Sequence, residues 1–371
     1  MSSRSARRRA NPLAFTLIEL LVVVAIIALL MSILLPSLRA AREQARAVVC
    51  GQRLRDFANG MGTYFAEHKD CVPGCNTSGV AIRAAVGPAS LMNRPKLPVQ
   101  SFDWITPLLS RSTQIPGSRV ERFKQVLNTF LCPSQRTYRT TLYTLGPGYA
   151  DKSQFGSDML GDPGGWIAAS YLMQAHFQYW GTQYVNQAIA THETNPANVI
   201  RARTVPATWE VASATFRSNL LQVGNPSRKV AGVDATRWVT AEGTIDFDAH
   251  PDPQFFGAFT TSGAWWTSSR EFGVANGSLN WSGRSVSSNC PAQGRGNLEL
   301  SYRHGLTRGA GPSGSSHDNK GMINAMFFDG SVRRLDDRAS RDPVYWYPYG
   351  SIVNLPEEGM LDVLNDGDKM P

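Results

Sequence analysis

Apolar positions near the start of the chain form one long uninterrupted segment. Phe15–Leu35 is a run of 21 residues that contains one charged residue, Glu19. A helix of that length extends roughly 31 Å, which is the thickness of the hydrocarbon core of a bilayer. A cleaved secretory signal has a shorter apolar core, of about 7–15 residues, with a cleavage site of small residues directly after it. The run therefore predicts a transmembrane helix that is retained.

A helical pattern continues beyond the apolar run. Apolar side chains recur at spacings of three and four residues: Leu54, Phe57, Met61, Tyr64 and Phe65. The pattern predicts that residues 36–69 extend the transmembrane segment into one helix of about 50 residues, with Pro36 kinking it at the membrane exit. Gly51 lies where the apolar face changes, so two separate helices are the alternative.

From residue 70 onward, short apolar or aromatic runs alternate with clusters of turn residues. The stretches RKVAGVDA and INAMFFDGSVRRL predict strands, and the Asp-Gly turn inside the second predicts a hairpin. The stretch Leu160–Trp180 is expected to contain a short helix. We expect an α+β fold, in which an antiparallel-sheet head with long loops, residues 70–371, packs on the apolar face of the long helix. The contacts should come chiefly from four helix residues: Leu54, Phe57, Met61 and Phe65.

A cluster of positive charges lies at the N-terminus, and this changes how the net charge of the chain is interpreted. The formal net charge of +8 alone would suggest a nucleic-acid partner. Four positive charges precede the apolar run without intervening aromatic residues: Arg4, Arg7, Arg8 and Arg9. Arginines that flank a membrane segment indicate its orientation, because the positively charged side stays in the cytoplasm. We predict no nucleic-acid partner, a cytoplasmic N-terminus and a head on the opposite side of the membrane.

The cysteines leave the disulfide pattern open. There are five: Cys50, Cys71, Cys75, Cys132 and Cys290. An odd number leaves at least one thiol outside any intramolecular disulfide. Disulfides are permitted outside the cytoplasm. Three residues separate Cys71 from Cys75, so these two make either a small disulfide loop or free thiols, because no second pair at zinc spacing follows.

Motifs for catalysis are absent, and one acidic stretch is a weak metal candidate. The sequence contains no nucleophile elbow, phosphate-binding loop or HExxH motif, so we do not expect an enzyme. Four oxygen-bearing side chains surround Gly367: Asp362, Asn365, Asp366 and Asp368. Oxygen ligands suit calcium, but the spacing and the closing glutamate of an EF-hand are missing. An acidic tail without an ion is the alternative.

The residues at the start of the apolar run, AFTLIEL, resemble the processing site of type IV prepilins and type II secretion pseudopilins. In that family a small residue, usually glycine, precedes the cut. A phenylalanine follows the cut and becomes the methylated N-terminus, and a glutamate stands at the fifth mature position. The resemblance assigns Ala14 and Phe15 to the two sides of the cut and Glu19 to the fifth position. Pro36 falls where the family often has a proline.

The resemblance implies a location, partners and a function. Residues 1–14 would be a cytoplasmic leader removed by a prepilin peptidase, and residues 15–35 the single span of the inner membrane, with the head periplasmic or extracellular. The other partners would be pilin or pseudopilin subunits and membrane lipid. Glu19 would pair with the N-terminal amine of a neighbouring subunit, because a charge inside a membrane helix requires a partner. The large head suits a minor or tip component.

A different class of function remains open. The chain is alternatively a membrane-anchored exported ligand-binding protein or enzyme, which uses the prepilin motif only for anchoring.

A second resemblance lies near the C-terminus. Large pseudopilin-like proteins common in planctomycete-type bacteria have a histidine, nine residues and then Asp-Gly. His304 with Asp329 and Gly330 resembles that element, although 24 residues separate His304 from Asp329. A Gly/Ser-rich insertion accounts for the difference, and His317, with 11 intervening residues, is the alternative. We expect a structural hydrogen bond from His304 that holds the Asp-Gly turn rather than an acid–base pair.

Overall fold

The computed structural model describes the following residues: 16–74, 103–110, 113–134, 139–140, 142–143, 166–167, 169–192, 195–201, 213–235, 245–246, 260–261, 300, 304–305, 321–340, 342–351 and 368–371. Contacts between residues divide the chain into two units, Met1–Glu43 and Gln44–Pro371. The boundary falls inside the first helix, so the C-terminal part of that helix belongs to the second unit.

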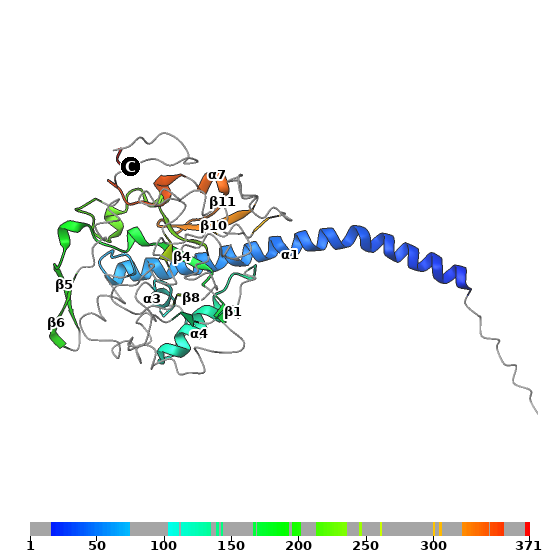
Figure 1. Cartoon of the computed structure of the whole chain (residues 1–371), viewed down its shortest axis with the longest axis horizontal. Helices are drawn as coiled ribbons and strands as arrows, with labels where there is room; N and C mark the ends of the chain where they lie inside the picture. The colour runs from blue at the N-terminus through cyan, green and yellow to red at the C-terminus, as the bar shows by residue number, and fades with distance from the viewer. Residues whose placement is uncertain are drawn as a thin grey trace, which may run out of the picture. The chain divides into compact units, whose positions relative to one another are not determined.

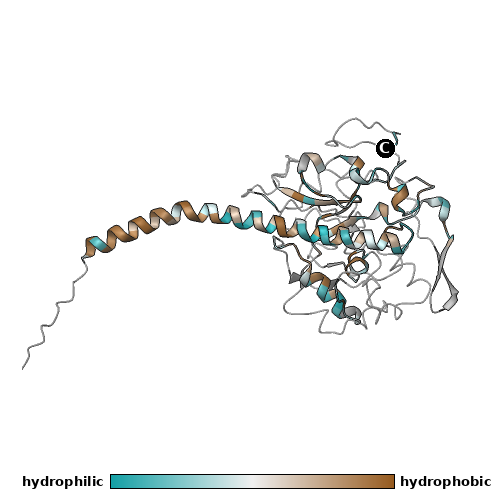
Figure 2. Ribbon diagram, turned by 180° about the vertical axis from the view of Figure 1, so that it is seen from behind, coloured by the Kyte–Doolittle hydropathy of each residue, from teal (hydrophilic) through white to brown (hydrophobic). Residues whose placement is uncertain are grey.

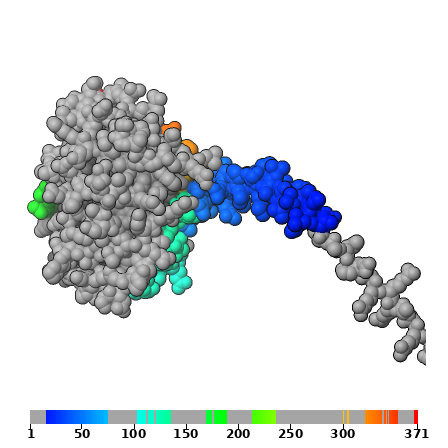
Figure 3. Space-filling model, turned by 45° about the vertical axis from the view of Figure 1, so that its right-hand side comes forward, coloured from blue at the N-terminus to red at the C-terminus, as the bar shows by residue number. Residues whose placement is uncertain are grey.

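Helix α1 (Leu17–Glu67) is 51 residues long and confirms the prediction of one long helix. The alternative of two helices is wrong, because the helix passes through Gly51 without a break. Pro36 also lies inside it, and the kink at Pro36 stays a prediction. From Leu17 to Leu35, α1 is mostly hydrophobic (Figure 2), and its large apolar side chains are exposed (Figure 3). This part of α1 is long and apolar enough to cross a membrane.

The second unit is built on a five-stranded sheet with the order β11-β10-β7-β4-β9. Figure 1 labels β11, β10 and β4 of this sheet. Its strands are β4 (Tyr171–Gln174), β7 (Val230–Asp234), β9 (Thr260–Thr261), β10 (Met322–Phe327) and β11 (Val332–Asp336). The first four in the sheet order are antiparallel, and β9 adds a short parallel edge to β4. The predicted α+β class, with a long N-terminal helix and an antiparallel sheet, is therefore confirmed.

Smaller elements surround this sheet. The helices are α3 (Ile105–Leu109), α4 (Arg119–Thr129) and α7 (Asp337–Ser340). Three strand pairs lie outside the main sheet: β1 (Arg139–Thr140) with β3 (Trp166–Ile167), β2 (Leu142–Tyr143) with β8 (Ile245–Asp246), and β5 (Ala188–His192) with β6 (Asn195–Arg201). Short 3-10 helices are η3 (Ala175–Phe177), η4 (Thr182–Tyr184), η6 (Leu220–Gln222), η7 (Pro226–Arg228) and η9 (Pro343–Tyr345).

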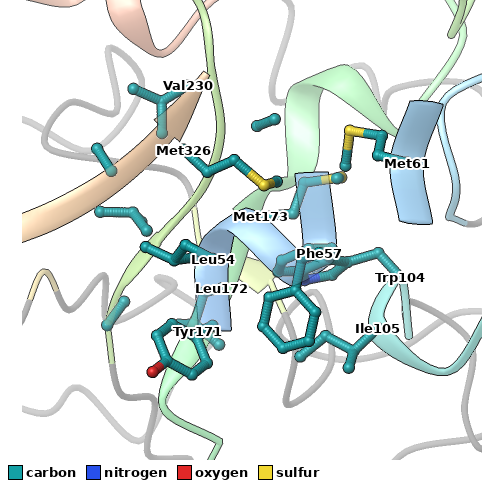
Figure 4. Packing of buried hydrophobic residues seen from close by; sticks show 14 of the residues in the cluster. Leu54, Phe57, Met61, Trp104, Ile105, Tyr171, Leu172, Met173, Val230 and Met326 are labelled. Carbon is teal, nitrogen blue, oxygen red and sulfur yellow. The ribbon is translucent and has the colours of Figure 1, made fainter. Parts of the chain in front are cut away.

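The predicted apolar face of α1 lies in the core of the second unit. All four residues expected to make the contacts are buried: Leu54, Phe57, Met61 and Phe65. The ring of Phe57 packs edge-to-face against Trp104 and against Tyr171, with centroids 5.5 Å apart in both pairs (Figure 4). Trp104 precedes α3 and Tyr171 begins β4, so one side chain of α1 contacts two layers.

A glycine sets the separation between α1 and α3. A Cβ atom added at Gly60 would lie 2.8 Å from the carbonyl oxygen of Leu108. That distance is shorter than van der Waals contact, so only glycine lets the two helices approach this closely. The close approach brings Trp104, next to α3, into the core around α1.

The predicted hairpin is also present. Strands β10 and β11 pair in antiparallel register from Met322 opposite Asp336 to Met326 opposite Val332. The turn between them contains Asp329 and Gly330, and Gly330 has a φ of 83°. Glycine adopts that left-handed conformation without steric cost, so the Asp-Gly pair fixes the position of the turn.

Candidate functional site

The start of α1 is held by reciprocal hydrogen bonds between Thr16 and Glu19. The backbone N–H and the hydroxyl of Thr16 both donate to Glu19 Oε2, at 2.9 and 2.8 Å. The backbone N–H of Glu19 donates to Thr16 Oγ1 at 3.2 Å. This is a capping box, which satisfies N–H groups that a helix start leaves unpaired. Glu19 Oε1 accepts no hydrogen bond from any described residue, so the carboxylate is positioned and retains a free oxygen.

The remaining predicted N-terminal and acidic positions are only partly described. Ala14 and Phe15 lie outside the described residues. Three of the four proposed calcium ligands also lie outside them, Asp362, Asn365 and Asp366, and Asp368 alone is described. The calcium site therefore stays a prediction.

One disulfide links α1 to the segment that follows α4. Cys50 and Cys132 are bonded, with their Cα atoms 5.1 Å apart, and both are buried. Cys71 is a free, partly buried thiol, so it forms no disulfide loop with Cys75. Burial, and secondarily Asp70, raises the pKa of the Cys71 thiol, which keeps it protonated and weakly reactive at neutral pH. Cys75 and Cys290 lie outside the described residues.

A buried group of ionisable side chains surrounds this disulfide. His304 Nε2 lies 3.4 Å from Cys132 Sγ and 3.1 Å from Asp234 Oδ2. The donor atoms of Cys50, Cys132, Asp234 and His304 all lie within 4.8 Å of one another. These four residues are called the Cys–His–Asp cluster below. Each of them is at most 1% exposed, so the cluster is not open to a substrate.

Asn324 holds the carboxylate of the cluster in place. Its backbone N–H and its side-chain amide donate to Asp234 Oδ2, at 2.8 and 2.9 Å. The amide also donates to the carbonyl oxygen of Ala47 on α1, at 3.4 Å. Asn324 thus connects β10 to both β7 and α1, and it fixes the orientation of the Asp234 side chain.

The expectation that His304 forms a hydrogen bond with the Asp-Gly turn is wrong. His304 pairs with Met322, the first residue of β10, whereas Asp329 lies beyond the last. Six strand residues extend about 20 Å, so the two side chains lie at opposite ends of β10. His304 contacts Asp234 instead. Asp329 accepts a hydrogen bond from the Ser331 N–H at 2.9 Å, and this bond within the turn stabilises it.

Sequence reasoning missed Asp234 and Asn324. Asp234 ends a strand whose five residues are all buried. A carboxylate at the end of a continuous apolar run is the signal that was available, because a buried charge requires a partner. The partner could not be identified in advance, because His304 is distant in sequence.

A surface hollow of about 1080 Å³ lies elsewhere in the second unit. Its lining includes Tyr184, Arg217, Tyr349 and Lys369. The guanidinium group of Arg217 lies 4.8 Å from the centre of the Tyr184 ring. Among the described residues that line it, no side chain is a carboxylate or an imidazole. The titratable side chains among these described lining residues are Tyr184, Tyr349, Lys369 and Arg217.

Comparison with known families identifies the N-terminal segment. Residues 9–35 match the prokaryotic N-terminal methylation motif, a range that contains Ala14, Phe15 and Glu19. No curated protein and no solved structure matches the chain. Together with the exposed apolar part of α1, the motif is consistent with a single-pass membrane anchor. The chain thus has a prepilin-type methylation motif at the start of a pilin-like arrangement, in which a long N-terminal helix is followed by an antiparallel sheet.

Proposed function

We propose that this protein is a prepilin-like subunit, cleaved after Ala14 by a prepilin peptidase and methylated at Phe15. The mature chain assembles through the N-terminal part of α1 into a type II secretion pseudopilus or a type IV pilus. The observation that supports this most is the change of environment along α1. Large apolar side chains from Leu17 to Leu35 are exposed, whereas the same helix from Ala47 onward contributes buried residues to the second unit. An exposed apolar surface of this extent requires lipid or other helices around it.

The capping box supports a role for Glu19 in assembly. Cleavage after Ala14 creates a new amine at Phe15, next to Thr16. The Glu19 carboxylate is already held at the helix start by one oxygen, Oε2. The other oxygen is available for the amine of a neighbouring subunit. The attraction between these charges is strong in the low dielectric of a membrane, and it favours a single axial register between adjacent helices.

The geometry near His304 supports its role as the histidine of the C-terminal element. A Cβ added at Gly305 would lie 3.9 Å from the Cα atom of Gly321. The chain therefore leaves this part of the structure at Gly305 and returns beside it at Gly321, as the flanks of an insertion of residues 306–320 would. Without the insertion, nine residues separate His304 from Asp329. This agreement favours His304 over His317.

The second unit is proposed to lie outside the cytoplasm and to have no enzymatic activity. The Cys50–Cys132 disulfide supports the location, because such bonds persist in oxidising compartments. Burial of the His304–Asp234 pair argues against acid–base catalysis there. The large head favours a minor or tip component, since bulky heads limit how densely subunits pack.

Mass spectrometry of the N-terminus of the native membrane protein tests the proposal. We expect a mature chain that begins at N-methylated Phe15. Ala14→Gly should be processed like the natural chain, whereas Ala14→Leu, with a bulky residue before the cut, should retain its leader. An intact N-terminal segment in the native protein would overturn the processing step. A normally processed chain whose deletion leaves filaments and secretion unchanged would overturn the assembly role and favour an anchored ligand-binding protein or enzyme.

A further inference from the structure

The Cys–His–Asp cluster combines the side chains that zinc prefers. The two sulfur atoms belong to Cys50 on α1 and Cys132 after α4. The imidazole is that of His304, which pairs with the first residue of β10, and the carboxylate is that of Asp234 at the end of β7. Structural zinc sites use four such donors, and the two thiolates disfavour the hard cations calcium and magnesium. All four side chains are buried, which is typical of a structural site rather than a catalytic one.

The distances in the cluster are close to those of a tetrahedral zinc site. Zinc–sulfur bonds of about 2.3 Å and zinc–nitrogen or zinc–oxygen bonds of about 2.0–2.1 Å place a sulfur about 3.6 Å from a nitrogen, and a nitrogen about 3.4 Å from an oxygen. The corresponding separations here are 3.4 Å, between Cys132 Sγ and His304 Nε2, and 3.1 Å, between His304 Nε2 and Asp234 Oδ2. The two sulfur atoms, bonded in the structure, would have to lie about 3.8 Å apart around an ion. Rotations about the Cα–Cβ bonds of Cys50 and Cys132 can supply that movement.

An unsatisfied oxygen in the cluster provides an independent indication. Asp234 Oδ1 is buried and has no hydrogen-bond partner among the described residues. A buried carboxylate oxygen without a partner costs free energy, whereas a cation bound by both oxygens of Asp234, with Oδ2 on the side of His304, would satisfy it. The two hydrogen bonds from Asn324 to Oδ2 hold the carboxylate in one orientation. Hydrogen bonds of this kind orient the ligands in known metal sites.

We propose that the dithiol form of this chain binds one zinc ion through Cys50, Cys132, His304 and Asp234, and that the disulfide is the metal-free form of the same site. Zinc binding displaces the two thiol protons and requires an unprotonated His304 Nε2. Conversion to the disulfide removes two electrons from the two thiolates, forms the S–S bond and releases the zinc ion. The electrons pass to a protein disulfide, which takes up two protons and becomes a dithiol. The inference does not depend on the proposed filament function.

Cobalt binding tests this site in the full-length chain in detergent. The protein is reduced with a phosphine, and Co²⁺ is added as a spectroscopic substitute for zinc. We expect visible bands of tetrahedral Co²⁺ and a sulfur-to-cobalt charge-transfer band, with one ion per chain, and loss of both when Zn²⁺ is added. Cys132→Ser and His304→Ala should each weaken the apparent Kd by about 100-fold or more, because each removes a ligand. Cys71→Ser, which alters a thiol outside the cluster, is the matched control and should bind as the natural chain does.

A stability measurement distinguishes loss of binding from loss of folding. Zn²⁺ should raise the Tm of the reduced natural chain, because a ligand that binds only the folded state stabilises it. It should leave the Tm of reduced Cys132→Ser unchanged. The proposal is overturned by a reduced, folded chain that shows no tetrahedral cobalt bands. It is equally overturned by a Cys71→Ser chain that loses as much binding as Cys132→Ser, or by a reduced chain that unfolds whether or not Zn²⁺ is present.

Discussion

At the residue scale, Glu19 serves both the local structure of α1 and the proposed assembly, and substitutions can separate the two. Glu19→Gln keeps a carbonyl oxygen for the hydrogen bonds from Thr16 but removes the charge. We expect it to insert into the membrane normally and to fail in assembly, because the amine of the neighbouring subunit loses its partner. Membrane fractionation and filament counts measure the two effects.

The matched control for Glu19 is Thr16→Ala. This substitution removes the hydroxyl of the capping box and leaves the carboxylate charged. It should weaken the first turn of α1 while assembly continues. If Glu19→Gln assembles as well as the natural chain, the charge at position 19 has no role in register.

Lys229 should make the free energy of unfolding of the second unit increase toward alkaline pH. Its Nζ donates to the carbonyl oxygen of Tyr347 at 2.7 Å, and burial lowers its pKa to about 7. Between that value and the ordinary lysine pKa, the unfolded chain binds a proton that the folded chain does not. The free energy of unfolding should therefore rise with pH from 7 upward, by up to about 1.4 kcal/mol per pH unit. Urea unfolding of the natural chain and of Lys229→Met measures this, and the variant should lack the increase. Equal slopes in both proteins would mean that Lys229 stays charged in the fold.

Sequence patterns revealed one of the two candidate sites and not the other. The methylation motif is contiguous, so the cleavage site, the glutamate and the apolar run can be recognised together. The residues of the Cys–His–Asp cluster lie between positions 50 and 304 of the sequence. They meet because β7 pairs with β10 and α1 packs beside these strands. Nothing in the local spacing of Cys50, Cys132 or His304 indicates that they meet, because the fold alone brings them together.

At the scale of elements, alanine substitutions at two nearby glycines of α1 should have opposite effects on stability, because only one of the two lies against α3. Gly60→Ala should destabilise the second unit by about 1–3 kcal/mol, since the new methyl group would overlap the Leu108 carbonyl. Gly62 is exposed and has no atom within 4 Å of an added Cβ. Gly62→Ala should therefore stabilise α1 by about 1 kcal/mol through helix propensity alone. Denaturant unfolding compares the two, and a stabilising Gly60→Ala would contradict the close approach of the helices.

The disulfide between α1 and the segment after α4 should contribute substantially to stability. Its cysteines are separated by 82 residues, and closing a loop of that size removes about 4–5 kcal/mol of unfolded-state entropy. Cys132→Ala should lower the free energy of unfolding by an amount of this order under non-reducing conditions. Cys71→Ala, which removes a free thiol, is the control and should change it by much less. Similar losses in the two variants would show that the disulfide does not form.

The elements that could be predicted are those with a clear period or turn. Helix α1 and the β10–β11 hairpin have a helical apolar stripe and an Asp-Gly turn. By contrast, the short helix predicted within Leu160–Trp180 is confirmed only as the three-residue 3-10 helix η3, and the strand β4 directly before it was not predicted. All four residues of β4 are buried, so the alternation that marks a half-exposed strand is absent and the period gives no guidance. The short edge strand β9 depends on its pairing with β4, which a local pattern cannot show.

At the scale of the whole molecule, the division of the chain predicts where it can be truncated. A chain that begins at Gln44 retains the buried residues of α1 from Ala47 to Phe65. We expect it to be soluble and to unfold cooperatively. A chain that begins at residue 70 loses this helix from the core and should fail to fold, because the cavity would expose the rings of Trp104 and Tyr171. Circular dichroism and size-exclusion chromatography measure both. A folded chain from residue 70 would show that the helix is dispensable.

The position of Cys50 also determines how the molecule bears mechanical tension. In the proposed filament, extension or retraction pulls on each subunit along α1. Apolar contacts such as those of Phe57 and Met61 can separate one after another under tension, because each is individually weak and imposes no fixed geometry on its partners. The Cys50–Cys132 bond does not yield in this way, so the pull on the helix passes directly to the chain beyond α4. In the proposed filament, a subunit under load can therefore lose part of its packing while Cys132 stays bonded to α1, which keeps the unfolded segment short enough to refold when the tension ends.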